Sequence, residues 1–273
     1  MSPEYSGRGD AVRSMELLWG RAAPGSRGPK QGTDLEAVVR AAIDLADAEG
    51  LEAVSMRRVA ERLGLGTMSL YTYVPGKGEM LDLMLDTVHG ERADEPIPAV
   101  GSPRKQLESV ARSQWTFHQR HPWTLYIASG RAVLGPNELD VYEAALAVAS
   151  GLGVSARDAV AIVDSIGLFV RGVARDAAEA EGAERVTGQS ELEWWTERDR
   201  ILTAKMTDER YPTLGRLDAE GGFAVPDDTP NYNLKFILDD FEFGLQRLLD
   251  GIEAYVKGAG KRRTSQPGRR PPR

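Results

Sequence analysis

The sequence predicts an all-α protein in which a small three-helix head precedes a larger helical body. Three observations support this fold class. Apolar residues recur every three or four positions along most of the chain, which is the spacing of one helix face. Residues that begin or end helices, chiefly Ser, Thr, Gly and Pro, fall at the ends of these periodic stretches. No stretch shows the strict alternation of apolar and polar residues that a half-buried strand requires.

Composition limits the possible classes of protein. The chain has 273 residues, 41% of them hydrophobic, which suits one large or two modest domains with a real core. It contains no cysteine, so we expect neither disulfides nor thiolate chemistry. We find no secretory signal and no apolar run long enough to cross a bilayer, and we therefore expect a cytoplasmic protein without a membrane partner.

The charge is unevenly distributed along the chain. The net charge is −7, yet residues 255–273 hold seven basic residues and no acidic one. Residues 1–80 are almost neutral, with ten basic and eleven acidic residues, so the excess of acid lies in residues 81–254. Bulk charge therefore does not favour nucleic-acid binding. Phosphate contacts would have to come from a few cations and from backbone N–H groups at helix starts.

Residues 1–32 form a glycine-, proline- and charge-rich arm that we expect to be mostly disordered. Its one apolar island, Met15–Trp19, either docks loosely or shows that Met15 is an alternative start. The end of the arm carries three basic residues, Arg21, Arg27 and Lys30. Such an arm could reach a minor groove or phosphates, or could equally be a solvated tail.

The first expected helix begins at a capping box and ends at a glycine. Thr33 and Glu36 stand three residues apart, so each side chain can bond a free backbone N–H at the position of the other. Gly50 is a typical helix stop. The apolar residues between these ends form one helical stripe: Leu35, Val38, Val39, Ala42, Ile43 and Ala46. This helix would brace the next two and complete a head over residues 33–78.

The stretch from Ser55 to Lys77 predicts two short helices joined by a tight turn. Ser55 is a good N-cap for the first of them. Gly64 allows the left-handed backbone that ends a helix at little cost, and the small Ala60 lets a second helix cross closely.

The second helix of the pair should run from about Thr67 through Tyr73, before Pro75 stops it. Leu70 would point back into the corner between the two helices, leaving the outer face free. That face would carry Thr67, Met68, Ser69, Tyr71, Thr72 and Tyr73. Hydroxyls suit phosphate oxygens and short side chains suit base edges, so the pattern favours a DNA-binding helix-turn-helix over an ordinary helical hairpin.

This stretch resembles the DNA-binding domain of the tetracycline-repressor (TetR) family of bacterial transcription regulators. The resemblance covers residues 59–65, 67–77 and 80–81, and its most specific part is the run Leu-Tyr-x-Tyr-Val-Pro-x-Lys at residues 70–77. The family often has histidine at the position of Tyr73 and an acidic residue at that of Gly78, so the departures are mild.

The motif and the resemblance together assign residues to DNA. Lys77 is the expected phosphate contact, and Tyr71 and Tyr73 are expected to touch the backbone or the bases. The hydroxyl of Ser55 and the guanidinium of Arg57 could hold phosphate at the start of the preceding helix. The predicted DNA-binding residues are Ser55, Arg57, Thr67, Met68, Ser69, Tyr71, Thr72, Tyr73 and Lys77.

Residues 79–255 are expected to form the helical body. A fourth helix over residues 79–89 would join it to the head, and a loop over residues 91–103 would follow. Further helices are expected over residues 104–120, 123–129, 138–151, 156–180, 191–206 and 231–255. The basic, proline-rich tail at 256–273 is expected to be disordered, and it could either add nonspecific DNA affinity or be a solvated end.

The body is similar to the branch of the family whose ligand-binding domain is like that of the tetracycline repressor itself. The matching segments are residues 121–123, 135–137, 193–195, 209–212, 241–245 and 248–251. The resemblance implies an internal cavity for a small-molecule effector, whose binding shifts the fourth helix and lowers DNA affinity. The candidate lining residues are Trp115, His118, Trp123, Phe169, Trp194 and Trp195. Aromatic residues at helical spacing are more often plain core.

The resemblance also implies a homodimer, in which two heads reach half-sites ~34–36 Å apart. The helix over residues 156–180 and the last helix of each subunit would form a four-helix bundle. The candidate interface residues are Phe236, Phe241, Leu245 and Leu248. The same face could instead pack only the core of one subunit.

The sequence offers little for catalysis or metal binding. His118 and His121 have a possible two-ligand spacing, but no cysteine or nearby third histidine joins them, so we expect no metal site and no cofactor. An all-helical enzyme and a protein-binding adaptor remain the alternatives, and neither a glycine-rich phosphate loop nor a nucleophile elbow supports the enzyme. We interpret the chain as a ligand-responsive transcription regulator, a repressor released from operator DNA by a small molecule, and not as an enzyme.

Overall fold

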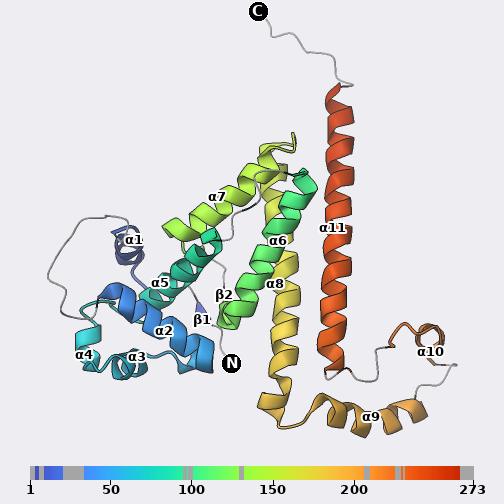
Figure 1. The fold of residues 1–273 in the computed structure, drawn as a ribbon, viewed down its shortest axis with the longest axis horizontal. Helices are drawn as coiled ribbons and strands as arrows, with labels where there is room; N and C mark the ends of the chain where they lie inside the picture. Colours follow the sequence, from blue (N-terminus) through green and yellow to red (C-terminus); the bar gives the residue numbers. More distant parts are fainter. Residues whose placement is uncertain are drawn as a thin grey trace, which may run out of the picture. The chain divides into compact units, whose positions relative to one another are not determined.

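The computed structural model of the protein describes residues 4–5, 9–20, 34–94, 97, 101–128, 132–205, 210–224, 229 and 231–264. Helices dominate these residues and confirm the all-α prediction (Figure 1). The β structure within them is a parallel pairing of β1 (Glu4–Tyr5) with β2 (Ile127–Ala128), too short to form a layer. The chain divides into two compact units. The first unit comprises Met1–Arg171 and Arg247–Arg273, and the second comprises Gly172–Gln246. This division differs from the predicted head and body, whose boundaries stay a prediction.

The head is built from short helices in the first unit. In chain order its elements are α2 (Leu35–Glu49), η1 (Leu51–Ala53), α3 (Met56–Arg62) and α4 (Thr67–Leu70). The carboxylate of Asp34 caps α2 by accepting from the N–H of Ala37 at 2.8 Å, whereas the predicted cap Thr33 lies outside the described residues. Gly50 ends α2 with φ of 87°, as the sequence predicts.

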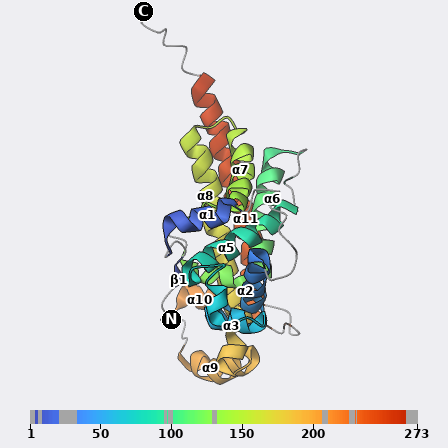
Figure 2. The same ribbon diagram turned by 90° about the vertical axis from the view of Figure 1, so that its left-hand side faces the viewer.

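The following helix, α5 (Lys77–Gly90), shares one hydrophobic core with the head. Leu70 at the corner of the helix-turn-helix and Ala60 at the crossing are both fully buried, as predicted. In Figures 1 and 2, α2 lies beside both α3 and α5. The apolar residues that fill it include Val38, Val39, Ile43, Val59, Val74, Met80, Leu81 and Met84.

Three acidic residues at helical spacing on α5 hold neighbouring elements in place. Glu79 accepts from the backbone N–H of Asp10 at 2.9 Å, and Asp82 accepts from the hydroxyl of Ser14 at 3.0 Å. Asp86 accepts from the backbone N–H groups that begin α7 (Pro136–Ser150), each at 3.0 Å. A Cβ on Gly135 would overlap the carboxylate of Asp86, so this close approach requires glycine.

The expectation of disorder fails for part of the N-terminal arm. Residues 11–20 form helix α1 (Ala11–Gly20), and Leu18 is 1% exposed in the same core as the head. The apolar island of the sequence is therefore one face of a helix that packs on α5. Ten residues are too few for a stable isolated helix, so only this tertiary contact explains it.

The body of the first unit continues with η2 (Glu91–Asp94), α6 (Pro103–Arg120) and η3 (Pro122–Tyr126). Ser155 caps α8 (Ala156–Thr187), because its hydroxyl accepts from the N–H of Asp158 at 3.2 Å, as predicted. The helix α8 extends seven residues beyond its expected end at Ala180.

The second unit contains the end of α8, α9 (Glu191–Lys205), α10 (Pro212–Ala219) and the start of α11 (Tyr232–Thr264). Helix α10 falls where a loop was expected, and it begins at Pro212, a residue well suited to a first helical turn. Helix α11 continues to Thr264, so the disorder expected from residue 256 does not hold for its last turns. Residues 265–273 lie outside the described residues.

Candidate functional site

The turn of the helix-turn-helix closes as a helix-ending motif centred on a glycine. Gly64 has φ of 67°, in the left-handed region that favours glycine. Its N–H bonds the carbonyl of Glu61 at 3.1 Å, and the N–H of Leu65 bonds the carbonyl of Ala60 at 2.9 Å. These bonds satisfy carbonyls that the end of α3 would otherwise leave unpaired. At the other end of α3, the hydroxyl of Ser55 accepts from the N–H of Arg58 at 3.3 Å, as predicted for a cap.

The reading helix α4 is shorter than the sequence predicts. It ends at Leu70, and the chain then continues as a turn through Tyr73. The N–H groups of Thr72 and Tyr73 bond carbonyls three residues back, at 3.2 and 3.0 Å, which tightens the backbone out of α-geometry. The hydroxyl of Thr72 also bonds the carbonyl of Ser69 at 2.7 Å. The predicted reading residues therefore lie on one helical turn and the turn after it.

The side chains of this surface divide by exposure. Met68 is 79% exposed and Tyr71 is 42% exposed, and Ser69 and Thr72 are exposed as well. Thr67 and Tyr73 are half-buried. Exposed apolar and aromatic side chains on a helix braced by a buried core are available to a partner. Contact with DNA by these residues stays a prediction.

The predicted phosphate contacts stand at helix starts beside this surface. Arg57 is in the first turn of α3, exposed, and 3.4 Å from Glu61 on the same helix. Lys77 is the first residue of α5 and is half-buried. The hydroxyl of Ser55 accepts its capping bond, so it could donate to a phosphate oxygen without losing that bond.

A cavity of about 240 Å³ lies within the body of the first unit. It is formed by residues of α5, η2, α6, η3, β2, α7 and α8 and by the loop before α7. Its lining residues are Leu85, His89, Arg92, Gln114, Phe117, His118, Thr124, Ile127, Ala132, Val133, Glu138 and Arg171. The cavity combines an apolar wall with two guanidinium groups and two imidazoles, which is the composition of a small-molecule site.

The two imidazoles of the cavity wall are uncharged at neutral pH. Burial, together with the charge of Arg92, lowers the pKa of His89 to about 3. Burial and the charge of Arg171 also lower the pKa of His118 to about 3. His89 stacks on Phe117 with ring centroids 4.8 Å apart. Nδ1 of His89 and Nε2 of His118 are buried and have no hydrogen-bond partner among the described residues.

The contacts of Thr124 assign the tautomer of His118. The hydroxyl of Thr124 donates its proton to the carbonyl of His121 at 2.7 Å. The same oxygen lies 2.9 Å from Nδ1 of His118, and it can only accept there. Nδ1 therefore carries the proton of neutral His118, and Nε2 is an acceptor.

The other predicted ligand residues are not in the wall of this cavity. Trp123 is 2% exposed and belongs to the shared core, where its indole N–H donates to Asp47 at 2.7 Å. Trp115 on α6 and Phe169 on α8 are half-buried. Trp194 and Trp195 are in the second unit and pack edge to face on each other, with centroids 5.0 Å apart. Of the six candidates, His118 alone lines the cavity. No local pattern along the chain pointed to the lining residues His89, Phe117 and Arg171.

Two of the four predicted dimer residues are buried within a single chain, and the other two are half-buried. Phe241 and Leu245 are 3% and 0% exposed in a single chain, so they pack the core of one subunit and have little surface left for a partner. Phe236 and Leu248 are half-buried. Leu168 on α8, which is not among the predicted interface residues, is 74% exposed.

In the part of the chain that the structure describes, no group of three or more His, Asp or Glu residues is arranged to hold a metal ion. None of the helices there is long and apolar enough to cross a membrane.

Two protein-family profiles match the chain, one over the N-terminal head and one over the body. Residues 38–84 match the profile described as "Bacterial regulatory proteins, tetR family". Residues 95–256 match the profile described as "Tetracyclin repressor-like, C-terminal domain".

Known relatives share most of the length of the chain. The HTH-type transcriptional repressor DrrR1 of Streptomyces coeruleorubidus is 42% identical over 266 residues, which cover 97% of this chain and 93% of the relative. The HTH-type transcriptional repressor Rv1353c of Mycobacterium tuberculosis is 26% identical over 260 residues, covering 90% and 93%.

Solved structures show the same arrangement of helices. Apo ActR from Streptomyces coelicolor is 26% identical, with a TM-score of 0.63 over 85% of this chain and 99% of ActR. ActR in complex with actinorhodin is 27% identical, with a TM-score of 0.65 over 84% and 97% of the two chains.

Proposed function

The chain belongs to the tetR family of bacterial regulatory proteins, and on this basis we propose that it is a homodimeric repressor that a small-molecule effector releases from operator DNA. As a transcription regulator it is not an enzyme. It would act in the cytoplasm, where bacterial DNA lies. The observation that carries the proposal is the reading surface formed by α4 and the turn after it. Met68 and Tyr71 are exposed on this surface, and Leu70 is buried in the core beneath it.

The effector site that we propose is the cavity of the body. At about 240 Å³ it exceeds a cavity of ~150 Å³ that holds benzene, so it has room for more than a single ring. Its wall includes Leu85 and His89 of α5, the helix that shares a core with the head. A ligand that binds one position of α5 better than another would therefore shift the head. The likeness to ActR, which has been solved with actinorhodin, supports this use of the cavity.

The DNA-binding role is tested at Tyr71. Operator sequences are selected from random DNA with the full chain, and affinity is measured by fluorescence anisotropy. We expect Tyr71→Ala to weaken operator binding about tenfold or more, because it removes an exposed aromatic contact from the reading surface. Tyr211→Ala is the matched control, since Tyr211 is 41% exposed and lies in the second unit. Equal loss in both variants, or no loss at Tyr71, would contradict the reading role.

The effector role is tested by filling the cavity. Compounds that raise the melting temperature are first found by thermal screening, because a ligand of the native state stabilises it. Val133→Trp should abolish both this stabilisation and the release of operator, while operator binding itself persists. Leu134→Trp is the control, because Leu134 is the next residue, is 48% exposed and is not among the lining residues. Retained response in Val133→Trp would place the effector elsewhere.

A further inference from the structure

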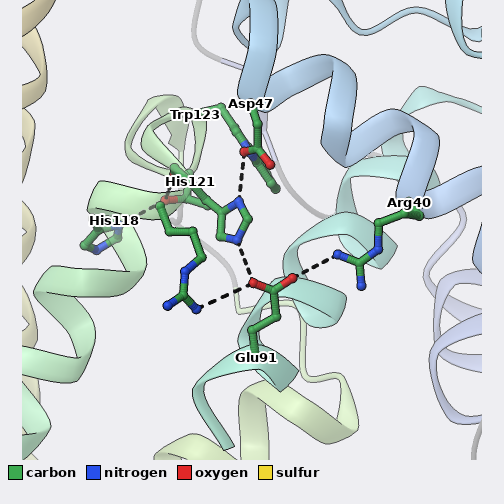
Figure 3. Close-up of polar contacts among 8 residues, drawn as sticks. Arg40, Asp47, Glu91, His118, His121 and Trp123 are labelled. Atoms are coloured by element: carbon green, nitrogen blue, oxygen red, sulfur yellow. Dashed lines mark hydrogen bonds and ion pairs between the residues drawn. The ribbon is translucent and has the colours of Figure 1, made fainter. Parts of the chain in front are cut away.

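His121 joins three elements of the first unit through both of its ring nitrogens (Figure 3). It follows the last residue of α6 and is 4% exposed. Its Nδ1 lies 2.8 Å from a carboxylate oxygen of Asp47 on α2. Its Nε2 lies 2.9 Å from a carboxylate oxygen of Glu91, which directly follows α5. We call these three residues the histidine latch.

The geometry of the latch favours a doubly protonated imidazole. A neutral imidazole has one N–H donor and one bare acceptor nitrogen, whereas ionised carboxylates only accept. A neutral His121 would therefore set a lone pair against a carboxylate oxygen at one of its two contacts. Burial alone would lower the pKa of His121, but the hydrogen bonds to Asp47 and Glu91 outweigh it and raise that pKa above 6.5. Hydrogen bonds from His121 and Arg40 outweigh the effect of burial on Glu91, and its pKa lies below 4.5.

The surrounding groups make Asp47 the contact that depends most on His121. Glu91 also pairs with Arg40 of α2 at 2.9 Å and with Arg120 of α6 at 3.8 Å. The same oxygen of Asp47 that faces His121 accepts the indole N–H of Trp123 at 2.7 Å, which is a neutral donor. If His121 loses its charge, Glu91 still pairs with Arg40 and Arg120. Asp47, in contrast, loses the cationic side chain that it contacts in this structure.

The latch lies between the head and the cavity wall. On the head side, Asp47 follows Leu45 and Ala46, which are buried in the shared core of α2. On the cavity side, the carbonyl of His121 accepts from Thr124, whose oxygen in turn accepts from His118. Thr124 and His118 both line the cavity. A single chain of hydrogen bonds thus runs from the cavity wall to α2.

We propose that His121, doubly protonated between Asp47 and Glu91, is the positioning residue that holds the head in its operator-binding position, and that loss of one ring proton releases α2. A released head must be ordered again when it binds DNA, which costs binding free energy. The latch therefore makes operator affinity depend on pH. This inference goes beyond the proposed function, because it assigns a control to residues that touch neither DNA nor effector.

The protonation state is tested by NMR of the full chain without any ligand. The chain has three histidines, so selective ¹⁵N- and ¹³C-labelling gives three imidazole signals, which single His→Gln variants assign. We expect His121 to be doubly protonated at pH 7 and to titrate above 6.5, while His89 and His118 remain neutral. Asp47→Asn should lower the proton affinity of His121 at least about tenfold. Asp44→Asn, a change at an exposed position on the same helix, should leave it unchanged. A neutral His121 at pH 7, or equal effects of the two variants, overturns the proposal.

The positioning role is tested by operator affinity between pH 6 and pH 9, with an operator selected from random DNA. At pH 6 the wild type should bind at least about fivefold more tightly than His121→Gln. At pH 9 the ratio of the two affinities should approach one, because the wild type has then lost the proton as well. Asp47→Asn should weaken operator binding at pH 6 as His121→Gln does. Because the side chain of Asp47 is more exposed than that of His121, this second variant disturbs the core less. A ratio that does not change with pH, or tighter binding by His121→Gln at pH 6, overturns the proposal. Failure to select any operator would instead count against the proposed function.

Discussion

The proposed reading helix and the proposed effector cavity position their side chains by opposite means. The reading surface is contiguous in sequence, and its side chains point outward, with Met68 79% exposed. The cavity wall collects side chains from Leu85 to Arg171, and its aromatic and imidazole residues point inward, with Phe117 and His118 each 4% exposed. One site is a local motif on a scaffold, whereas the other exists only after several helices have packed.

Because of this difference, the two regions respond differently to changes elsewhere in the structure. A local motif keeps its geometry if the body is altered, since a cap, a glycine stop and a buried corner residue determine it. A cavity responds to changes in any helix of its wall, and that sensitivity allows a ligand to alter the packing. The histidine latch lies between the head and the cavity wall, because Asp47 belongs to α2 of the head and the carbonyl of His121 accepts from Thr124 of the wall.

The largest expected effect tests whether the body is needed to hold two heads together. Leu168 on α8 is 74% exposed in a single chain, and α8 covers one of the two helices that the sequence analysis predicts for the dimer. Leu168→Glu should therefore dissociate the dimer and weaken operator binding about a hundredfold or more, because the second head no longer binds as part of the same molecule. Sedimentation equilibrium and operator titration measure the two effects.

Leu192→Glu is the control for this change. Leu192 is 75% exposed but lies on α9. If Leu168→Glu stays dimeric, this face of α8 is not the interface. If it dissociates and still binds operator tightly, one head suffices for binding.

We expect two histidines of the body, and none of the described head, to cause a loss of unfolding free energy between pH 6.5 and pH 3. The described head residues and the reading motif contain no histidine, whereas His89 and His118 have folded pKa values of about 3 against 6.5 when unfolded. The unfolded chain therefore takes up protons first as pH falls below 6.5. The stability that the neutral imidazoles contribute is present above pH 6.5 and is lost progressively as pH falls toward 3.

His118→Gln should reduce the loss of unfolding free energy between pH 6.5 and pH 4.5 by roughly 2 kcal/mol. Urea titrations at several pH values provide the measurement. His121→Gln is the contrasting variant. The raised pKa of His121 means that its contribution is fully present below pH 6.5 and is lost as pH rises through the folded value, so this variant should leave the acid slope unchanged. Similar acid slopes in wild type and His118→Gln would show that His118 is protonated in the folded state.

The smallest expected effect concerns the head alone. Ser55→Ala removes the cap of α3 and should lower the unfolding free energy by about 1 kcal/mol. Ser69→Ala, at an exposed position on α4, should change it by less than about 0.5 kcal/mol. The variants are compared by urea unfolding at pH 7. If both changes cost the same, the capping bond of Ser55 adds nothing beyond a surface hydroxyl.

Local chemistry made the helix-turn-helix predictable from sequence. The cap at Ser55, the left-handed glycine at position 64 and the inward Leu70 all act within a few residues, and the structure has each where it was expected. The same reasoning predicted a helix through Tyr73, whereas α4 ends at Leu70. Helix propensity alone does not reveal the tightened turn that follows Leu70. The same reasoning also left out α1 and α10, which are too short to be stable without their neighbours.

The sequence by itself determined that the chain is helical, that it carries a helix-turn-helix and that it resembles the TetR family. Only the tertiary structure decided which side chains line the cavity, and that Phe241 and Leu245 are used in the core of one subunit. It also shifts the pKa values of the histidines in opposite directions, upward for His121 and downward for His89 and His118. His121 finds its carboxylates 74 and 30 residues away along the chain, whereas His118 is surrounded by apolar packing and guanidinium groups. Protonation depends on the charges and the water that surround a group in space, and residue spacing along the chain carries little information about either.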